Sequence, residues 1–415
     1  MGVRESRRRF LKHFAAGGSL ALGGISGCVG QITGGSESVR FGSILPTSLS
    51  GELGTVGSHG VRAIEQAVAD VNRAGGPLDR EIEFLPEDSG ADTDRALDAY
   101  ESLREEGTIG FVGGLLSEVS LELVEEVPGE CMQVSSASTH PSLASKGYAD
   151  ETKYFARTVP SDVLQAVVMV KILQDAKYVG ADAAAVLHVD DSFGAGLADR
   201  IESLFDGTVT ATVPYDPDAD AYGGVLDEAF ADDPDGVALV ATPGTTEGLM
   251  TEWADSEYDA EWVLSAGLLS DSPAGYFRDA YSASIRVEET DGALRLRQQL
   301  RDVAPLAPFT ENAYDALFLQ ALAVERAGEA TPEAIAENIE AVSAGPGHTV
   351  TVGEFDRAKS LLRAGREVTY QGAAGSVGLN ERLEPLSPYV VEQVEGRNVV
   401  PLELVHSSYF EGRAV

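Results

Sequence analysis

Short apolar runs that alternate with helical segments constrain the fold of this 415-residue chain more than any other feature. The run VRFGSIL at 39–45 is followed at 60–72 by GVRAIEQAVADVN, in which Val and Ile recur at intervals of three and four residues. That spacing predicts a helix with one inward apolar stripe, and Gly75 and Gly76 should end it. Strands and helices in such alternation form a parallel sheet with right-handed crossovers. Further strand-like runs lie at 82–85, 108–114 and 131–136.

The alternation begins again after residue 160. Helical spacing at 160–176 precedes the buried strand-like run AAAVLHV at 183–189, and Thr331 before Pro332 is typical of a helix N-cap in a later, mostly helical region. At about 100 to 200 residues per domain the chain is long enough for two. The fold class is therefore α/β with two alternating units. Between 193 and the C-terminus we expect helix at 193–205, strands at 209–213, 236–241 and 261–267, and a closing strand pair at 389–405.

The N-terminal 27 residues have the organisation of an export signal. Five basic residues between Arg4 and Lys12 stand against one acidic residue, Glu5, and the apolar run FAAGGSLALGGIS follows. About a dozen residues cannot cross a bilayer, which needs about 20, so the run is typical of a signal peptide. The segment SRRRFLK at 6–12 matches the twin-arginine export motif S-R-R-x-F-L-K at every position. We therefore expect export across the membrane.

Cys28 follows this run in the sequence ISGC, which resembles a lipobox, where cleavage before the cysteine leaves its thiol available for a lipid. The alternative is an incidental cysteine. Residues 28–38 are rich in Gly and Ser and should form a flexible tether. We expect the chain at the extracellular face of the membrane, anchored through lipid at Cys28. Cys131 lies in an apolar run, and we expect a buried, inert thiol.

The composition is strongly acidic, with 67 Asp and Glu against 30 Lys and Arg and a formal net charge of −37. Such an excess destabilises a compact chain by self-repulsion, whereas 1 M salt screens charges within about 3 Å, so a high-salt habitat fits best. The charge argues against nucleic acid or an anionic membrane surface as a partner, because both are polyanions. The six His are scattered, and no G-x-S-x-G or P-loop motif is present. We expect no metal, no cofactor and no catalysis.

A set of stretches in a fixed order resembles a known family. FGSILPTSLSGELG, FVGGLLSEVS, SSASTHPSL, FARTVPSD, VLHVDDSFGAGLA, ENAYDAL and GSVGLNERLEP resemble extracytoplasmic solute-binding proteins of the leucine/isoleucine/valine-binding type, the type I periplasmic binding fold. This resemblance covers roughly residues 39 to 400. It implies two Rossmann-like lobes joined by a multi-strand hinge, namely 39–160 with 288–383 and 161–287 with 384–415. It also implies capture of a small solute for the permease of an ATP-driven (ABC) importer.

The residues themselves point to an anion-binding edge. In VGGLLSEVS a strand end runs into a helix start, where Ser117 can cap the helix and free N–H groups can hold a carboxylate. The hydroxyl-rich turn at 135–139 should lie beside it, at the carboxyl ends of parallel strands, although such hydroxyls can also serve turns and caps alone. The resemblance implies hydroxyls from Ser117 and Thr139, backbone contacts from Leu116, Ala137 and Ser138, and an aromatic cover from Phe193.

Departures from the family pattern leave the solute open. Gly267 or Leu268 stands where an acidic partner for a ligand ammonium is expected, and Asp271 is the nearest substitute. Val56 occupies the place of an aromatic in the first loop, whereas Asp162 is retained at the lobe crossing. A branched-chain or other apolar amino acid is the first expectation, with amides, urea-like solutes and organic acids as alternatives. A ligand-sensing ectodomain for a signalling partner is the rival function. The span after 280 is also shorter than usual and lacks the G-x-x-G-T strand expected there, which leaves the second hinge segment unplaced.

Overall fold

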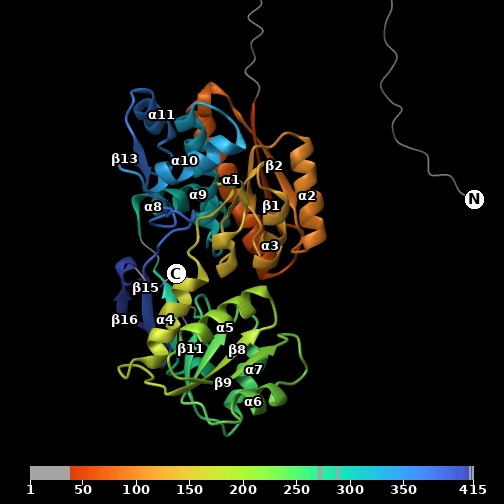
Figure 1. Ribbon diagram of the computed structural model, residues 1–415, viewed down its shortest axis with the longest axis vertical. Helices are drawn as coiled ribbons and strands as arrows, with labels where there is room; N and C mark the ends of the chain where they lie inside the picture. Colours follow the sequence, from red (N-terminus) through yellow and green to blue (C-terminus); the bar gives the residue numbers. More distant parts are fainter. Residues whose placement is uncertain (1–37, 270–272, 287–288, 411–412, 414–415) are drawn as a thin grey trace, which may run out of the picture. The chain divides into compact units, whose positions relative to one another are not determined.

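Two largely parallel sheets, each with helices on both faces, organise the chain in the computed structural model, which describes residues 38–269, 273–286, 289–410 and 413 (Figure 1). The five-stranded sheet has the order β2-β1-β3-β4-β7, and the seven-stranded sheet has the order β16-β15-β12-β11-β10-β8-β9. We call the first sheet with its helices lobe 1 and the second lobe 2. The export signal, Cys28 and Asp271 lie outside the described residues. The α/β class with two Rossmann-like lobes is confirmed.

Lobe 1 combines the first part of the chain with a later helical part. Its sheet contains β1 (Val39–Leu45), β2 (Ile82–Asp88), β3 (Gly110–Gly113), β4 (Met132–Ser135) and β7 (Phe155–Arg157). Its helices are α1 (Glu52–Arg73), α2 (Thr93–Glu105), α3 (Ser117–Glu126), α8 (Asp291–Gln299), α9 (Thr310–Ala327), α10 (Pro332–Ala344) and α11 (Phe355–Arg363). Two small sheets accompany them, β5 (Tyr148–Ala149) with β6 (Thr152–Lys153), and β13 (His348–Val350) with β14 (Val368–Tyr370).

The sequence signals for helix ends in lobe 1 are confirmed. Gly75 and Gly76 follow α1 with φ of 86° and 70°, and the Gly76 N–H bonds back to the Val71 carbonyl at 3.0 Å. Glycine adopts positive φ without the steric penalty that a Cβ brings, so these two residues let the chain turn away at the end of α1. Thr331 caps α10, since its hydroxyl accepts from the Ala334 N–H at 3.1 Å.

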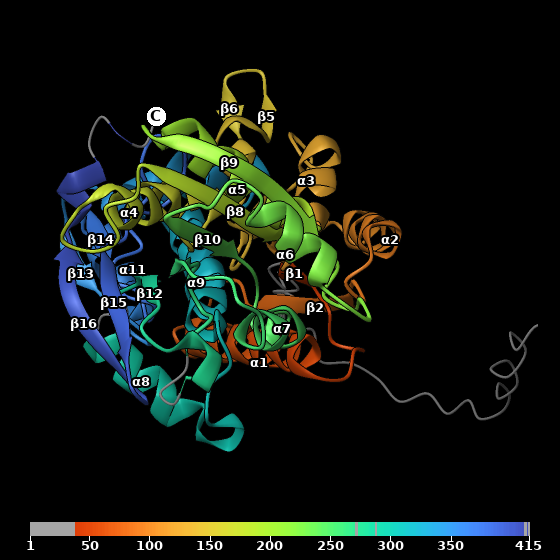
Figure 2. The same cartoon turned by 90° about the horizontal axis from the view of Figure 1, so that it is seen from below.

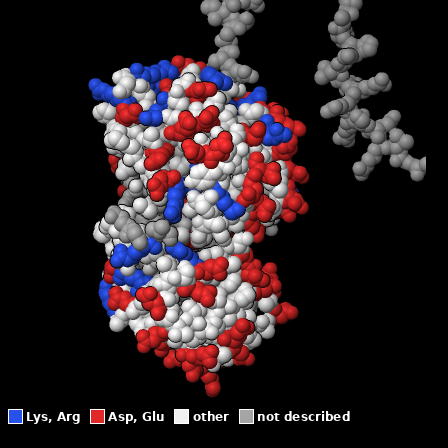
Figure 3. Space-filling view, in the orientation of Figure 1, with Lys and Arg blue, Asp and Glu red and all other residues white. Residues whose placement is uncertain are grey.

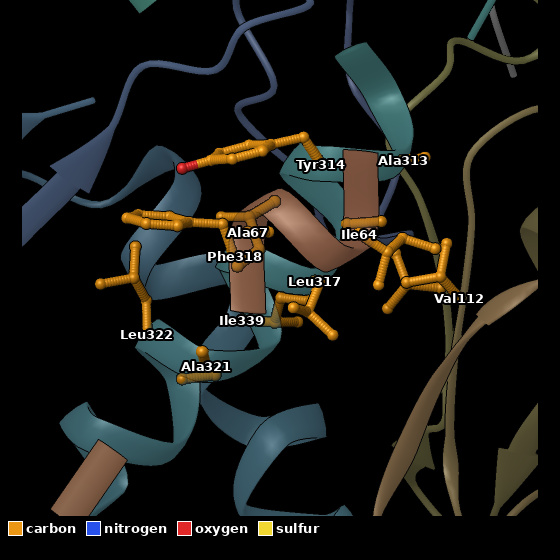
Figure 4. Close-up of a cluster of buried hydrophobic side chains, with 14 of the residues drawn as sticks. Ile64, Ala67, Val112, Ala313, Tyr314, Leu317, Phe318, Ala321, Leu322 and Ile339 are labelled. Carbon is orange, nitrogen blue, oxygen red and sulfur yellow. The ribbon is translucent and has the colours of Figure 1, made fainter. Parts of the chain in front are cut away.

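The apolar core of lobe 1 lies on both faces of its sheet. Between the sheet and α1, α9 and α10, Ile64, Val112 and Ile339 are fully buried, and the rings of Tyr314 and Phe318 stack with centroids 5.6 Å apart (Figure 4). A second cluster fills the opposite face against α2 and α3. A parallel sheet covered on both faces favours strands that are apolar on both sides, which is why β3 is a continuous apolar run and β1 is apolar except at Arg40 and Ser43.

Lobe 2 is the second alternating unit. Its strands are β8 (Ala183–Val189), β9 (Thr208–Tyr215), β10 (Gly236–Val240), β11 (Glu261–Leu264), β12 (Tyr281–Ile285), β15 (Tyr389–Glu395) and β16 (Asn398–Val405). Its helices are α4 (Asp162–Gln174), α5 (Ser192–Leu204), α6 (Gly223–Ala229) and α7 (Glu247–Ala254). In Figure 2, α4 lies to one side of β10 while α6 and α7 lie to the other. Along β8, Ala184 and Val186 face α4 and α5, whereas Ala185 and Leu187 face α6 and α7.

One expectation about lobe 2 is wrong. The sequence after 280 lacks the family's usual G-x-x-G-T strand signal, yet β12 forms there, parallel to β11 and antiparallel to β15. Its sequence, YSASI, alternates small polar and apolar residues, and pairing on both sides stabilises it despite the weak local signal. Alternation of this kind is the signal that could have found it.

The chain passes between the lobes three times, and hydrogen bonds join these crossings. The first crossing follows β7, the second follows β12, and the third precedes β15. The Arg157 N–H donates to the Leu383 carbonyl at 3.0 Å, which joins the first crossing to the third. The Arg286 N–H donates to the Pro388 carbonyl at 3.0 Å, which joins the second to the third. In the part of the chain that the structure describes, no helix has the length and apolarity to cross a membrane.

Candidate functional site

The predicted site residues of lobe 1 gather where β3 and β4 end. The two strands are parallel neighbours with Val112 opposite Val134, so the loops that follow them begin at the same edge of the sheet. Serine hydroxyls join these loops. The Ser135 hydroxyl donates to the Gly114 carbonyl at 2.8 Å, and the Ser138 hydroxyl lies 3.1 Å from the carbonyl oxygens of Gly114 and Leu116. This network holds the two loops together.

Two of the predicted backbone contacts have partners inside this network. The N–H groups of Ala137 and Ser138 lie 3.3 and 2.9 Å from the Ser135 hydroxyl oxygen, and the Ser138 carbonyl accepts from Arg157 at 3.3 Å. Ser138 is 1 % exposed, which leaves its side chain within the network. We therefore assign Ser138 a structural part in the site, and its contact with a ligand stays a prediction.

The start of α3 has backbone N–H groups without an intrahelical partner, but Ser117 does not cap the helix as predicted. Ser117 is the first helical residue and Leu116 is the N-cap, without a side-chain capping bond. The expectation that Ser117 caps the helix is therefore wrong, because its backbone is already helical. The Ser120 N–H bonds to the Leu116 carbonyl at 3.1 Å, so the N–H groups of Ser117, Glu118 and Val119 precede the first intrahelical bond. Such groups, at the positive end of the helix dipole, can bind an anion.

Thr139 and Asp162 connect the loop after β4 to the first helix of lobe 2. The Thr139 hydroxyl donates to Asp162 Oδ2 at 2.7 Å, and the Asp162 N–H donates to the Thr139 carbonyl at 2.9 Å. Ser161 is the N-cap of α4 and Asp162 its first residue. These two residues, predicted separately, are therefore in direct contact through two hydrogen bonds across the first crossing.

Burial dominates the electrostatics of Asp162. The residue is 2 % exposed, and this burial raises the pKa of its carboxyl to about 7, against the lowering effects of the Thr139 hydrogen bond and of Arg157. A neighbouring carboxylate, Asp191, raises it further. Asp162 thus changes charge near neutral pH, which an exposed aspartate does not.

Lobe 2 contributes the start of α5, where Asp191 is the N-cap and accepts from the Gly194 N–H at 2.7 Å. Phe193 lies in the first turn and packs, half-buried, against both apolar clusters of lobe 2. Burial raises the pKa of Asp191, and burial together with Asp191 raises the pKa of Glu118 on α3. Since α3 and α5 contact each other, two like charges face each other between the lobes. The role of Phe193 as a ligand cover stays a prediction.

A groove of about 900 Å³ adjoins this constellation. It is lined by residues from both lobes. Three of them are sequence neighbours of predicted site residues: His140 follows Thr139, Val163 follows Asp162 and Ser192 precedes Phe193. Gly196 on α5 also lines it, and a Cβ built there would lie 2.4 Å from His140 Nε2, so any larger residue would require the His140 ring to move. In Figure 3, acidic side chains cover much of the visible face of both lobes, while basic ones gather at the top and in the band between the lobes.

Two predicted site residues, Val56 and Asp271, are not found in this group. Val56 is not in the first loop but within α1, where it is 8 % exposed and packs in the apolar core of lobe 1, so the assignment to a ligand-facing loop is wrong. Asp271 lies outside the described residues. Gly267, which with Leu268 is one of the two positions predicted to match the family's acidic residue, has φ of 88°, a conformation that suits glycine.

Sequence reasoning missed an ion pair beneath the site. Arg157, at the end of β7, is fully buried; its Nε lies 3.0 Å from Glu384 Oε2, and its Nη1 lies 3.0 Å from the His140 carbonyl oxygen. Glu384 belongs to the third crossing, so one guanidinium joins two crossings and the loop after β4. Arg157 lies within FARTVPSD, a stretch that carried the resemblance, and a charge in an apolar strand is a signal that could have found it. Among the described residues no group of three or more His, Cys, Asp or Glu could hold a metal ion.

Comparisons with known proteins agree with this architecture. The model of a family described as periplasmic binding protein matches residues 38–378. The chain is 41% identical over 376 residues to the chemotactic signal transduction system substrate-binding protein BasB of Halobacterium salinarum, covering 90% of this chain and 91% of the relative.

Solved structures show the same fold. The branched-chain amino acid transporter substrate-binding protein LivJ of Streptococcus pneumoniae, in complex with isoleucine, superimposes with a TM-score of 0.67 at 16% identity, over 88% of this chain and 99% of that one. A solute-binding protein of an ABC transporter from Rhodopseudomonas palustris, in complex with p-hydroxybenzoic acid, gives 0.69 at 14% identity, over 89% and 98%. This chain therefore belongs to the periplasmic binding protein family and has the type I fold of the leucine/isoleucine/valine-binding proteins.

Proposed function

We propose that this chain captures a small carboxylate-bearing solute between its two lobes outside the cell and presents it to a membrane partner. The observation that carries the proposal is the meeting of the β3 and β4 loops, the free N–H groups at the start of α3 and the Thr139–Asp162 connection to lobe 2. A carboxylate would lie at the α3 N-terminus, with Ser117, Thr139, Leu116 and Ala137 around it. In this proposal the chain is a binding protein and not an enzyme.

Several sequence predictions belong to the same proposal. Lobe 1 would comprise 39–160 with 288–383, and lobe 2 would comprise 161–287 with 384–415. Lipid at Cys28 and the tether at 28–38 would keep the protein at the extracellular face of the membrane. The family to which the chain belongs is extracytoplasmic, which supports this location.

Amino acids are the first candidates for the solute. LivJ is described in complex with isoleucine, and a relative in Pseudomonas aeruginosa is named for binding leucine, isoleucine, valine, threonine and alanine. A ligand ammonium buried without a counter-charge is costly, and neither Gly267 nor Leu268, the nearest matches to the family's acidic position, carries a charge. An organic acid is therefore the second candidate, and the complex of the Rhodopseudomonas palustris protein with p-hydroxybenzoic acid supports it.

The membrane partner has two candidates. The permease of an ABC importer is supported by the transporter proteins that share the fold. A chemotactic transducer is supported by the similarity to BasB, which covers nine-tenths of both chains. Solute-dependent stimulation of a co-reconstituted transport ATPase would favour the importer, and solute-dependent binding to a transducer ectodomain would favour the sensor.

A thermal-shift screen in molar salt tests solute capture. Amino acids, amides and short organic acids are added singly, and a true ligand raises the melting temperature by binding only the folded chain. The variant Ser117→Ala/Thr139→Ala should lose this rise, because each polar group left unmet in the complex costs about 1–3 kcal/mol. Ser360→Ala, on the exposed face of α11, is the matched control and should keep the rise. A screen without any shift contradicts the proposal.

A further inference from the structure

Three successive peptide groups after β3 turn their carbonyl oxygens to the same buried hydroxyl. The carbonyl oxygens of residues 114–116 lie 3.1, 3.3 and 3.1 Å, in chain order, from Ser138 Oγ. We propose that Ser138 is a positioning residue, which holds these carbonyls on one side of the loop and so directs the N–H groups of residues 115–117 to the other side, for a solute carboxylate. The inference deepens the proposed function and rests on it, but the hydroxyl acts without touching the solute.

The hydrogens around Ser138 can be assigned from the neighbouring acceptors. A carbonyl oxygen only accepts, whereas a serine hydroxyl has one hydrogen to donate and lone pairs to accept. If Ser138 donated to the Ser120 hydroxyl, 2.8 Å away, three carbonyl oxygens would face its lone pairs. Ser138 therefore donates to a carbonyl and accepts from Ser120, which in turn accepts from Gln133 Nε2 at 3.5 Å. All three side chains are at most 1 % exposed, so no solvent takes part in this chain of hydrogen bonds.

The planar peptide converts a held carbonyl into a directed N–H group. In a trans peptide the C=O of one residue and the N–H of the next point in opposite directions. Because Ser138 holds the Leu116 carbonyl, the Ser117 N–H points away from the buried hydroxyls. The N–H groups of Leu115 and Leu116 do the same, since the carbonyls that precede them also face Ser138. One hydroxyl thereby sets the direction of three successive donors.

These three donors are available to a ligand. In the part of the chain that the structure describes, the N–H groups of Leu115, Leu116 and Ser117 have no hydrogen-bond acceptor. Leu115 and Ser117 are only 8 % and 7 % exposed, although buried backbone N–H groups are nearly always paired. An anionic group would pair them, and the positive end of α3 would add to its attraction. The direction of these donors therefore affects how well a carboxylate is held.

Calorimetric titration of the full chain in 2 M KCl at pH 7 tests the inference. The probes are two pairs of solutes that differ in a carboxylate against an amide, namely leucine with leucinamide and 4-hydroxybenzoate with 4-hydroxybenzamide. The unmodified chain should bind the carboxylate member of a pair about tenfold or more tightly, the scale of one charge-assisted hydrogen bond. Ser138→Ala should reduce this ratio at least about threefold, because the donors lose their fixed direction.

Two further variants separate positioning from general destabilisation. Ser343→Ala removes a hydroxyl of α10 that is 3 % exposed, donates to the Glu340 carbonyl at 3.0 Å and accepts from the Leu379 N–H at 3.1 Å. This matched control should lower the stability and keep the ratio. Ser120→Ala should give an intermediate ratio. The double variant Ser120→Ala/Ser138→Ala should have the ratio of Ser138→Ala alone, since Ser120 acts through Ser138.

The outcomes distinguish the two proposals. A ratio that is unchanged in Ser138→Ala, or that falls equally in Ser343→Ala, overturns the positioning role and leaves carboxylate capture standing. If Ser138→Ala fails to fold, the ratio in Ser120→Ala decides in the same way. Equal binding of both members of each pair by the unmodified chain, or binding of none of them, counts against carboxylate capture of such solutes and removes the inference with it. A large ratio that falls stepwise through Ser120→Ala and Ser138→Ala supports both.

Discussion

Replacing Glu384 with glutamine should destabilise the fold strongly, because it leaves the Arg157 guanidinium buried without its counter-charge. Arg157 is fully buried and Glu384 is 7 % exposed. The guanidinium donates to Glu384 through Nε, at 3.0 Å, and through Nη2, and its Nη1 donates to the carbonyls of Ser138 and His140. Removing one partner of such a buried pair costs about 3–5 kcal/mol, a large share of the roughly 5–15 kcal/mol that stabilises a typical protein.

Urea denaturation followed by circular dichroism in 2 M KCl measures this loss, since urea leaves the ionic strength unchanged. The double variant Arg157→Met/Glu384→Leu should be more stable than Glu384→Gln, because an apolar pair leaves no buried charge. Glu101→Gln, which breaks the exposed i,i+3 pair with Arg104, is the control and should not move the midpoint. A loss below about 1 kcal/mol in Glu384→Gln, or a double variant less stable than the single one, would refute the reasoning.

Three further predictions concern other parts of the molecule. Gly113→Ala should lose about 1–3 kcal/mol in urea denaturation, because Gly113 has φ of 154° and a Cβ there would lie 2.4 Å from the Ile44 carbonyl oxygen, whereas Gly224→Ala, with no atom within 4 Å, should lose nothing. Burial raises the pKa of Asp315 from 3.8 to about 7, so the folded chain binds a proton there more tightly than the unfolded chain, and the unfolding free energy should fall as pH rises from 4 to 7. In Asp315→Asn, the fall in unfolding free energy between pH 4 and pH 7 should be smaller by up to about 4 kcal/mol. An unchanged pH dependence would contradict the raised pKa of Asp315. Because the net charge is −37, the melting temperature should rise steeply from 0.2 to 3 M KCl, and a flat dependence would argue against adaptation to high salt.

The fold could be predicted from local pattern wherever a strand is buried on both faces. The run expected at 183–189 is β8, and the run at 39–45 is β1, because both are mostly apolar and both lie inside covered sheets. The strand β12 escaped because its residues are small and partly polar, and its pairing partner β15 lies about a hundred residues later. Strand formation at such a place depends on tertiary contacts rather than on local preference.

The site could be predicted less completely, for a related reason. The sequence indicates that the ends of β3 and β4 carry hydroxyls, and parallel pairing then brings these residues together. It does not indicate which hydroxyl meets which partner, as in the contact of Thr139 with Asp162, or whether a serine is inside a helix or caps it. Val56 shows the same limit, since one residue more or less in the loop before α1 decides whether it faces the core. Such details depend on the three-dimensional course of the loops.

The three crossings, joined to one another by the amides of Arg157 and Arg286, determine how the lobes can move. A single connection would let one lobe swivel or slide in any direction against the other, whereas three connections in register permit only a bend in which all of them change their dihedral angles together. The cost of an unproductive motion is therefore the breaking of several hydrogen bonds at once. We therefore expect bending about the crossings to be the easiest motion between the lobes, and in the proposed function closure around a solute would follow this bend.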